Sequence, residues 1–228
     1  MIYWIMWFLV STGYFFAFPS RIIGKKYLKY IKKDAGILAF NHQSNNDGVI
    51  IKAKVVPTAK MMGKESLFNG KVKGWFFRTI GAYPVNRGGN DIQAVKTTLK
   101  HLKDGKKVGI APEGTRVKEG ESAEFKNGVV MFAIKTDSYI VPMIFRKPTS
   151  KPFRTNTLLI GKPFKLSQID GFEEKKTDKD TLNKATEILT EKMDYLKTVD
   201  INEYVKIVKA DIKNITKNIK QNSKKDNQ

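Results

Sequence analysis

The sequence of 228 residues contains no cysteine and only two histidines, His42 and His101. The lack of cysteine excludes disulfides, thiolate metal sites and a cysteine nucleophile. Two histidines are also too few for a histidine-rich metal site, so we expect no metal centre. Acidic residues are scarce: 22 of them stand against 42 lysines and arginines, which gives a formal net charge of +20. This surplus predicts attraction to a polyanion, either an anionic membrane surface or a nucleic acid.

Charge is also absent from residues 1–19, which hold eight of the 25 aromatic residues. The segment has neither the basic start nor the small-residue cleavage site of a secretory signal. Its composition predicts a membrane anchor that spans the bilayer or lies in its interface, the alternative being a buried core helix. By the positive-inside tendency, the basic block that follows places the body of the protein at the cytoplasmic face of the cell membrane. This block comprises Arg21, Lys25, Lys26, Lys29, Lys32 and Lys33.

Beyond the basic block, short apolar runs alternate with amphipathic segments. The runs predict strands at residues 36–40, 55–61, 82–85, 107–111, 139–145 and 155–161. Helical spacing predicts a short helix from residue 48 and longer helices at 64–80, 91–104, 127–136 and 178–198. Asn90 is expected to cap the helix at 91–104. The alternation favours an α/β fold with its functional sites at the ends of the strands.

The composition divides the chain into three regions. We expect a hydrophobic and basic membrane anchor at 1–33, a central α/β domain at 34–170, and a lysine-rich C-terminal helix and tail at 171–228. Residues 206–228 contain seven lysines against two aspartates. This end is either a solvated, fraying tail or an electrostatic tether to anionic lipid.

His42 follows the apolar run at 36–40, and Asp47 comes five residues later. If the loop turns into a helix, the carboxylate of Asp47 can hold the imidazole and leave its other nitrogen free to take a proton. Ser44 lies between them, but it lacks the Gly-x-Ser-x-Gly elbow of a serine nucleophile and is better suited to capping a helix.

Two arginines also follow predicted strands. Arg87 comes after the run at 82–85, and Arg116 ends the segment Glu113-Gly114-Thr115-Arg116 after the run at 107–111. A guanidinium group matches a phosphate well, and a glycine permits close approach to the backbone. Either arginine alone could form a surface ion pair, but the two together, with a glycine turn beside one of them, favour a phosphate-binding pocket.

In order and spacing, these groups resemble the motifs of the glycerolipid acyltransferases typified by 1-acyl-sn-glycerol-3-phosphate acyltransferase. The resemblance spans residues 36–165, with Ala111 standing where the family usually carries a bulky aromatic residue. The matching motifs are Asn41-His42-x4-Asp47, Val85-Asn86-Arg87, Pro112-Glu113-Gly114-Thr115-Arg116 and Val141-Pro142. The resemblance implies an α/β fold with a mixed, largely parallel sheet flanked by helices, and it makes 34–170 the catalytic domain.

The resemblance further implies acyl transfer from a thioester to the sn-2 hydroxyl of lysophosphatidate, giving phosphatidate, without a cofactor. The acyl donor is either acyl-CoA or acyl-carrier protein. His42 would be the general base, held by Asp47. Glu113, Gly114 and Thr115 would form a turn beside the acceptor. Arg87 and Arg116, with Lys64 or Lys126 as helpers, would bind its phosphate.

The sequence is also compatible with two other functions. A sister enzyme of the same family would acylate another lysophospholipid or glycerol 3-phosphate. A basic membrane-binding module would carry out no catalysis. The sequence contains no motif of a nucleic-acid-binding domain, so we expect an anionic membrane surface, and no nucleic acid, as the polyanionic partner.

Overall fold

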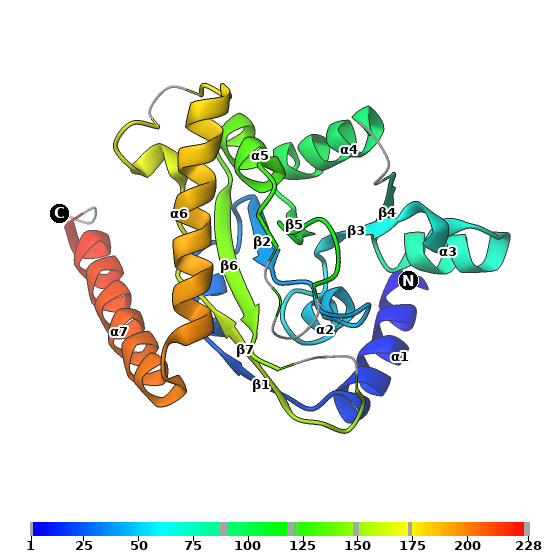
Figure 1. Ribbon diagram of the computed structural model, residues 1–228. Helices are drawn as coiled ribbons and strands as arrows, with labels where there is room; N and C mark the ends of the chain where they lie inside the picture. The colour runs from blue at the N-terminus through cyan, green and yellow to red at the C-terminus, as the bar shows by residue number, and fades with distance from the viewer. Residues whose placement is uncertain are drawn as a thin grey trace.

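The computed structural model describes residues 2–86, 91–117, 121, 123–147, 151–172 and 175–225. Within these ranges seven strands form one sheet in the order β1-β7-β6-β2-β5-β3-β4 (Figure 1). The strands are β1 Ser20–Ile23, β2 Gly36–Phe40, β3 Lys60–Lys64, β4 Ala82–Val85, β5 Lys107–Ile110, β6 Tyr139–Phe145 and β7 Asn156–Ile160. Strands β6 and β7 pair antiparallel, and the other neighbours in the described sheet are parallel. The predicted mixed, largely parallel sheet is therefore confirmed.

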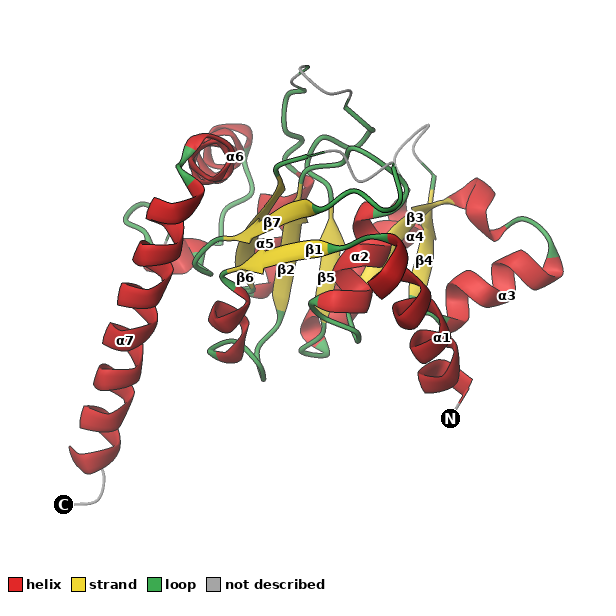
Figure 2. Cartoon of the chain, turned by 90° about the horizontal axis from the view of Figure 1, so that it is seen from below, coloured by secondary structure: helices red, strands yellow, loops and turns green. Residues whose placement is uncertain are grey.

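Helices cover both faces of the sheet, as Figure 2 shows. On β2, Ile37 and Ala39 belong to the core cluster that contains residues of α4, α5 and α6, whereas Leu38 and Phe40 pack with α2 and the end of α1. Because successive side chains of a strand point to opposite faces, a central strand with a helical layer on each side is apolar throughout. The α-helices are α1 Ile2–Ala17, α2 Asp47–Lys54, α3 Lys71–Thr79, α4 Ile92–Lys103, α5 Gly128–Thr136, α6 Lys179–Thr198 and α7 Ile201–Lys225. Short 3-10 helices lie at η1 Lys25–Lys29, η2 Glu65–Phe68 and η3 Leu166–Gln168.

The strand predicted at 55–61 is wrong in position, since β3 begins at Lys60. Val55 instead closes α2, where its N–H donates to the carbonyl of Ile51 at 2.9 Å. The ammonium group of Lys52 then donates to the carbonyls of Pro57 and Ala59, at 2.7 and 2.5 Å. These bonds hold residues 55–59 as a turn. Val55 and Val56 therefore end helix α2 and do not begin a strand.

The cap of α4 also differs from the prediction. The Asp91 carboxylate accepts the N–H of Ala94 at 2.8 Å and so caps the helix. Asn90, the predicted cap, lies outside the described residues. An aspartate at this position satisfies a free N–H of the first helical turn and places a negative charge at the helix N-terminus, which is favourable.

The prediction of a fraying tail is wrong for the described part of residues 206–228, because α7 is a helix of 25 residues. Its first turns pack on the body of the protein through the buried side chains of Tyr204 and Val208. The Tyr27 hydroxyl donates to Asp211 Oδ2 at 2.7 Å, and the Tyr204 hydroxyl donates to the carbonyl of Ile160 at the same distance. Figure 2 shows the rest of α7 extending from the sheet in the same downward direction as α1.

The N-terminal region contributes both a helix and a strand. Strand β1, within the segment expected as anchor and basic block, pairs in parallel with β7. Helix α1 packs on α2 and α3 with one side and exposes large apolar residues on the other. None of the helices in the described part of the chain combines the length and hydropathy needed to cross a membrane. The exposed apolar side chains of α1 are Ile2, Trp4, Ile5, Phe8, Leu9, Phe15 and Phe16.

Candidate active site

Asn41 fixes the point at which the chain leaves the sheet after β2. Its buried side chain donates to the carbonyl of Phe145 at 3.1 Å and accepts the N–H of the same residue at 2.8 Å. The amide thereby continues the pairing of β2 with β6 by one position and directs the next residue, His42, out of the carboxyl edge of the sheet. Sequence reasoning identified Asn41 only as part of a motif, because the partner lies 104 residues away.

The predicted pair of His42 and Asp47 is present. His42 Nδ1 lies 2.9 Å from Asp47 Oδ2, with the imidazole side chain 15% exposed and the carboxylate fully buried. Since a carboxylate only accepts hydrogen bonds, the proton of this bond belongs to Nδ1. Nε2 then carries the free lone pair, and among the described residues it has no hydrogen-bond partner. The imidazole can therefore take a proton on its exposed side.

The backbone of the loop holds the Asp47 carboxylate in place. Oδ2 accepts the N–H groups of Gln43 and Ser44 at 2.7 and 2.8 Å, and Oδ1 accepts the Ser44 hydroxyl at 3.3 Å. Asp47 is also the first residue of α2, where the helix dipole favours a negative charge. The Ser44 hydroxyl accepts the N–H of Asn46 at 3.0 Å as well, so it orders the entry to the helix. The five-residue spacing thus forms one closed turn around the carboxylate.

The second loop comes from β5, the neighbour of β2, and is bonded to the first. The Glu113 carboxylate accepts the N–H of His42 at 2.8 Å, and the N–H of Val117 donates to the carbonyl of His42 at 2.9 Å. Burial raises the pKa of Glu113, and the bond from the His42 N–H opposes this rise. Gly114 has a φ of 70°, the left-handed conformation that the turn requires. The turn therefore fixes the backbone of His42, whereas Asp47 holds its side chain.

The predicted phosphate-binding residues are distributed along this edge of the sheet. Lys126 lies across the turn: a Cβ on Gly114 would stand 3.0 Å from its Cδ and Cε. Arg116 is exposed directly before Val117, and Lys64 is exposed at the end of β3. Arg87 lies outside the described residues, which resume at Asp91. The structure thus brings Lys126 and Arg116 to the loop of Glu113, whereas Lys64 lies beyond β5.

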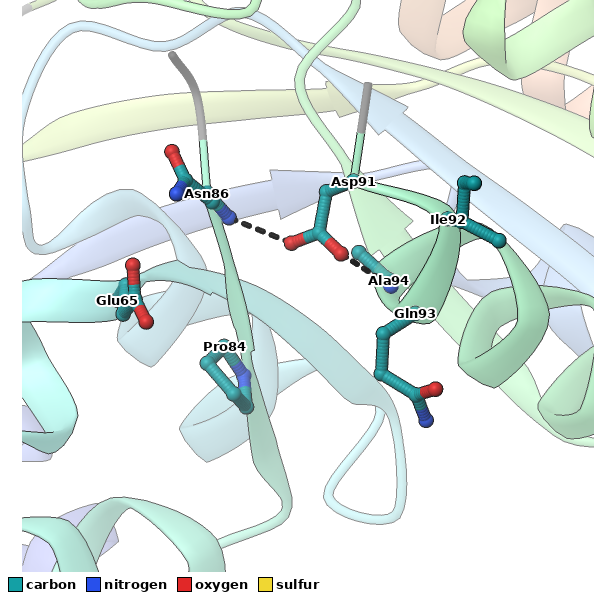
Figure 3. Close-up of a pocket in the computed structure, with 7 residues that line it drawn as sticks. All are labelled: Glu65, Pro84, Asn86, Asp91, Ile92, Gln93 and Ala94. Carbon is teal, nitrogen blue, oxygen red and sulfur yellow. Dashed lines mark hydrogen bonds between the residues drawn. The ribbon is translucent and has the colours of Figure 1, made fainter. Parts of the chain in front are cut away.

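A cavity of about 460 Å³ opens at the outer end of the sheet, between the end of β4 and the start of α4 (Figure 3). Neither His42 nor Asp47 lines it, and its ionisable side chains are the carboxylates of Glu65 and Asp91. Asp91 uses both oxygens to accept the N–H groups of Asn86 and Ala94, at 2.7 and 2.8 Å. The Asp91 carboxylate therefore ties the end of β4 to the start of α4, and the cavity between them does not contain the reactive pair. Its lining residues are Glu65, Pro84, Asn86, Asp91, Ile92, Gln93 and Ala94.

Sequence reasoning missed the contribution of α6. Arg146 follows β6, and its guanidinium donates to the carbonyls of Leu196 and Val199 at 2.8 Å and to that of Lys197. It thereby caps the C-terminal end of α6 at the edge that holds His42. The ammonium of Lys197 lies 5.8 Å from the Phe125 ring and interacts with the Glu113 carboxylate. The pairing of Arg146 with α6 spans about 50 residues and has no local signal.

Comparison with known proteins assigns this architecture to a family. A family model described as Acyltransferase matches residues 21–146, more than half of the chain. The chain belongs to this acyltransferase family. The match begins after α1 and ends with Arg146, before α6 and α7.

Individual relatives agree with the family. The acyltransferase is 33% identical over 136 residues to the 1-acyl-sn-glycerol-3-phosphate acyltransferase of Bacillus subtilis, covering 57% of this chain and 67% of that protein. It is 28% identical over 146 residues to the 1-acyl-sn-glycerol-3-phosphate acyltransferase beta of Homo sapiens, covering 61% of this chain and 50% of that protein. The crystal structure of the 1-acyl-sn-glycerophosphate acyltransferase PlsC from Thermotoga maritima has the same fold. Its TM-score is 0.60 at 22% identity, over 80% of this chain and 73% of that one.

Proposed function

We propose that the acyltransferase transfers an acyl chain from a thioester to the sn-2 hydroxyl of lysophosphatidate and so forms phosphatidate. The observation that carries the proposal is the pair of His42 and the buried Asp47 at the carboxyl edge of the family's sheet, with the side chain of His42 held by Asp47 and its backbone held by Glu113. The names of the Bacillus and human relatives support lysophosphatidate as the acceptor.

The chemistry follows from the tautomer of His42. Nε2 takes the proton of the acceptor hydroxyl while the hydroxyl oxygen attacks the thioester carbonyl carbon. The resulting oxyanion intermediate collapses, the carbon–sulfur bond breaks, and the departing thiolate receives the proton from His42. Asp47 stabilises the transient imidazolium across the 2.9 Å bond. General-base catalysis of this kind typically contributes about 10²–10⁴ in rate.

We assign the oxyanion to the backbone of the turn that follows β5. The N–H of Gly114 already donates to the carbonyl of Ala111 at 3.1 Å. The N–H groups of Glu113 and Thr115 are therefore the donors proposed for the developing charge. Donors fixed in advance, as here by the Glu113–His42 bond, stabilise such a charge without reorganising.

We assign the acceptor phosphate to Arg87 and Arg116, with Lys126 and Lys64 as helpers. Arg116 and Lys126 are supported by their places on and across the turn. Each charge-assisted contact with a phosphate contributes about 1.5–3 kcal/mol. Lys197 adds a positive charge at the same edge from α6.

The acceptor and the donor are tested together. Purified protein in mixed micelles is offered lysophosphatidate, other lysophospholipids or glycerol 3-phosphate, each with acyl-CoA and separately with acyl-carrier protein. Phosphatidate from lysophosphatidate, at a kcat/KM at least tenfold above that for any other acceptor, supports the proposal. A preference for another acceptor assigns the sister reaction, and no product in any arm assigns a binding role.

We also propose that α1 and α3 place the acyltransferase on the cytoplasmic face of the cell membrane. Helix α1 exposes its apolar side and packs next to α3, on which Val72 and Trp75 are exposed among Lys71, Lys73 and Arg78. Aromatic side chains flanked by basic ones are typical of a surface that lies at lipid headgroup depth. Four exposed lysines of α7, Lys206, Lys209, Lys213 and Lys217, are proposed as an electrostatic tether to anionic lipid.

Vesicle flotation tests this surface. Phe8→Asp places a charge on the exposed side of α1, and we expect at least a tenfold loss of binding to vesicles with anionic lipid, because burying a charge opposes the apolar contact. The matched control is Ile92→Asp, an equally exposed apolar residue at the start of α4, which should bind as the wild type does. Equal binding of both variants would contradict the assignment. Replacing the four α7 lysines by glutamine should weaken binding only at low salt.

A further inference from the structure

Helix α1 is bonded to both ends of α2, the helix that begins with Asp47. At the C-terminal end, the indole N–H of Trp7 donates to the carbonyl of Lys52 at 3.4 Å, and the ammonium of Lys54 donates to the carbonyl of Phe18. At the N-terminal end, the Tyr14 hydroxyl donates to Asn46 Oδ1 at 3.0 Å. Three hydrogen bonds therefore join α1 and the residue that follows it to α2 and its N-cap, although α1 lies outside the family match.

The bond from Tyr14 leads directly to the reactive pair. Asn46 precedes Asp47, and its N–H donates to the Ser44 hydroxyl at 3.0 Å. That hydroxyl donates to Asp47 Oδ1 at 3.3 Å, and Asp47 Oδ2 accepts from His42. The carbonyl of Asn46 accepts the N–H of Ile50 at 2.8 Å, which is the first bond of α2. A shift of Asn46 therefore moves the start of the helix and the carboxylate together.

Tyr14 is also at the boundary between protein and proposed lipid. Its ring stacks on Phe18, with centroids 4.9 Å apart, and is half-buried. The next two residues, Phe15 and Phe16, are 65% and 69% exposed. One turn of α1 thus holds the active-site loop on one side and presents two phenyl rings on the other.

Resting on the function proposed above, we propose that Tyr14 is a positioning residue that couples the seating of α1 on a bilayer to the geometry of His42 and Asp47. A bilayer that holds Phe15 and Phe16 fixes α1, and Tyr14 then fixes Asn46 and the loop around the carboxylate. Binding to the bilayer accordingly raises kcat itself, beyond the effect of concentrating the acceptor. If the Tyr14–Asn46 hydrogen bond had only a structural role, its removal would lower the stability of the protein and leave this rise in kcat intact.

The test uses Tyr14→Phe, which removes the hydroxyl and keeps the ring on Phe18. Turnover is measured with a short-chain, water-soluble lysophosphatidate, with and without vesicles that contain anionic lipid. The matched control is Tyr30→Phe, which loses the same group from an exposed contact with Thr216 Oγ1 at 3.3 Å. Vesicle flotation and thermal unfolding are run for each protein.

For the wild type we expect vesicles to raise kcat by about threefold to tenfold, the value of one hydrogen bond. Tyr14→Phe should lose this rise while it keeps its KM, its vesicle binding and its melting temperature within a few degrees. Asn46→Leu should show the same loss of the rise in kcat. The double variant should lose no more than either single variant, because both changes remove the same Tyr14–Asn46 hydrogen bond. Tyr30→Phe should behave as the wild type.

A full rise in kcat in Tyr14→Phe, or additive losses in the double variant, would overturn the coupling. A loss that coincides with poor vesicle binding or unfolding in both single variants would also overturn it, in favour of a purely structural tie. No turnover by the wild type with or without vesicles would instead contradict the proposed function, so the two failures are distinguishable.

Discussion

Asp47→Asn isolates the charge of the reactive pair from its geometry. The amide oxygen can take the place of Oδ2, where it would still accept the N–H groups of Gln43, Ser44 and His42 Nδ1. The NH₂ group of the asparagine would then face the Ser44 hydroxyl, which in the wild-type protein donates to Asp47 Oδ1. The bond with Ser44 then reverses, with the NH₂ group as donor and the hydroxyl oxygen as acceptor. The variant keeps the shape of the loop and loses the negative charge, so its fold should be intact.

The size of the effect follows from the distance and the burial. In the proposed reaction, the proton taken by His42 creates an imidazolium whose Nδ1 lies 2.9 Å from a fully buried carboxylate. Two unit charges about 4 Å apart interact by about 4 kcal/mol at an effective dielectric constant of 20. Because each 1.36 kcal/mol changes a rate tenfold, we expect kcat to fall by about 10²–10³. The charge matters only once the proton has moved, so the KM for the acceptor should change less than about twofold.

The assay is steady-state phosphatidate formation in mixed micelles, with circular dichroism to verify folding. Asp137→Asn is the matched control, since it removes a carboxylate from a surface ion pair with Lys165 at 2.7 Å, outside the active site. It should keep at least half of the wild-type kcat. A folded Asp47→Asn protein with a kcat within threefold of the wild type would refute the reasoning.

Three further predictions concern the side chains of Arg116, Glu113 and Lys52. Arg116→Ala should raise the KM for lysophosphatidate by about tenfold to 100-fold with kcat within threefold, whereas the exposed Arg154→Ala should not; equal KM values would remove Arg116 from the phosphate site. Burial raises the pKa of Glu113 above its ordinary value of 4.5, so the protein loses stability as the pH rises from about 4.5 through that pKa. Glu113→Gln should lack this loss in urea unfolding measured from pH 4 to 8, and identical pH slopes would contradict it. Burial, with Lys60 nearby, lowers the pKa of Lys52 from 10.5 to about 7, so stability should rise between those pH values and Lys52→Gln should flatten the rise; a wild-type curve that is already flat would refute the assignment.

The parts of the fold that could be predicted are those encoded by local patterns. The run Gly36–Phe40 is buried on both sides, and its apolar composition predicts a central strand that the structure confirms as β2. The pair of His42 and Asp47 was predictable because a single turn of five residues brings them together. Helix α7 also carried a local signal, with Tyr204, Val208, Ile212 and Ile215 at helical spacing, but its many lysines favoured a solvated tail.

The parts that could not be predicted depend on distant partners. Strand β1 is four residues long, contains Arg21 and lies at the sheet edge, so only its pairing with β7 identifies it. The Asn41–Phe145 bonds and the capping of α6 by Arg146 join segments about 100 and 50 residues apart. The contact of Tyr14 with Asn46 depends on the packing of α1, which apolar composition alone does not orient.

The central claim is that His42 acts as the general base in a direct transfer between thioester and lysophosphatidate. The most direct measurement compares phosphatidate formed by purified wild-type protein and by His42→Ala, with a radiolabelled acyl thioester and the protein tested afterwards for bound label. We predict product from the wild type, a loss of at least 10² in His42→Ala, and no label on either protein. Equal turnover by the two proteins, or an acylated wild-type chain on the reaction path, would contradict the account.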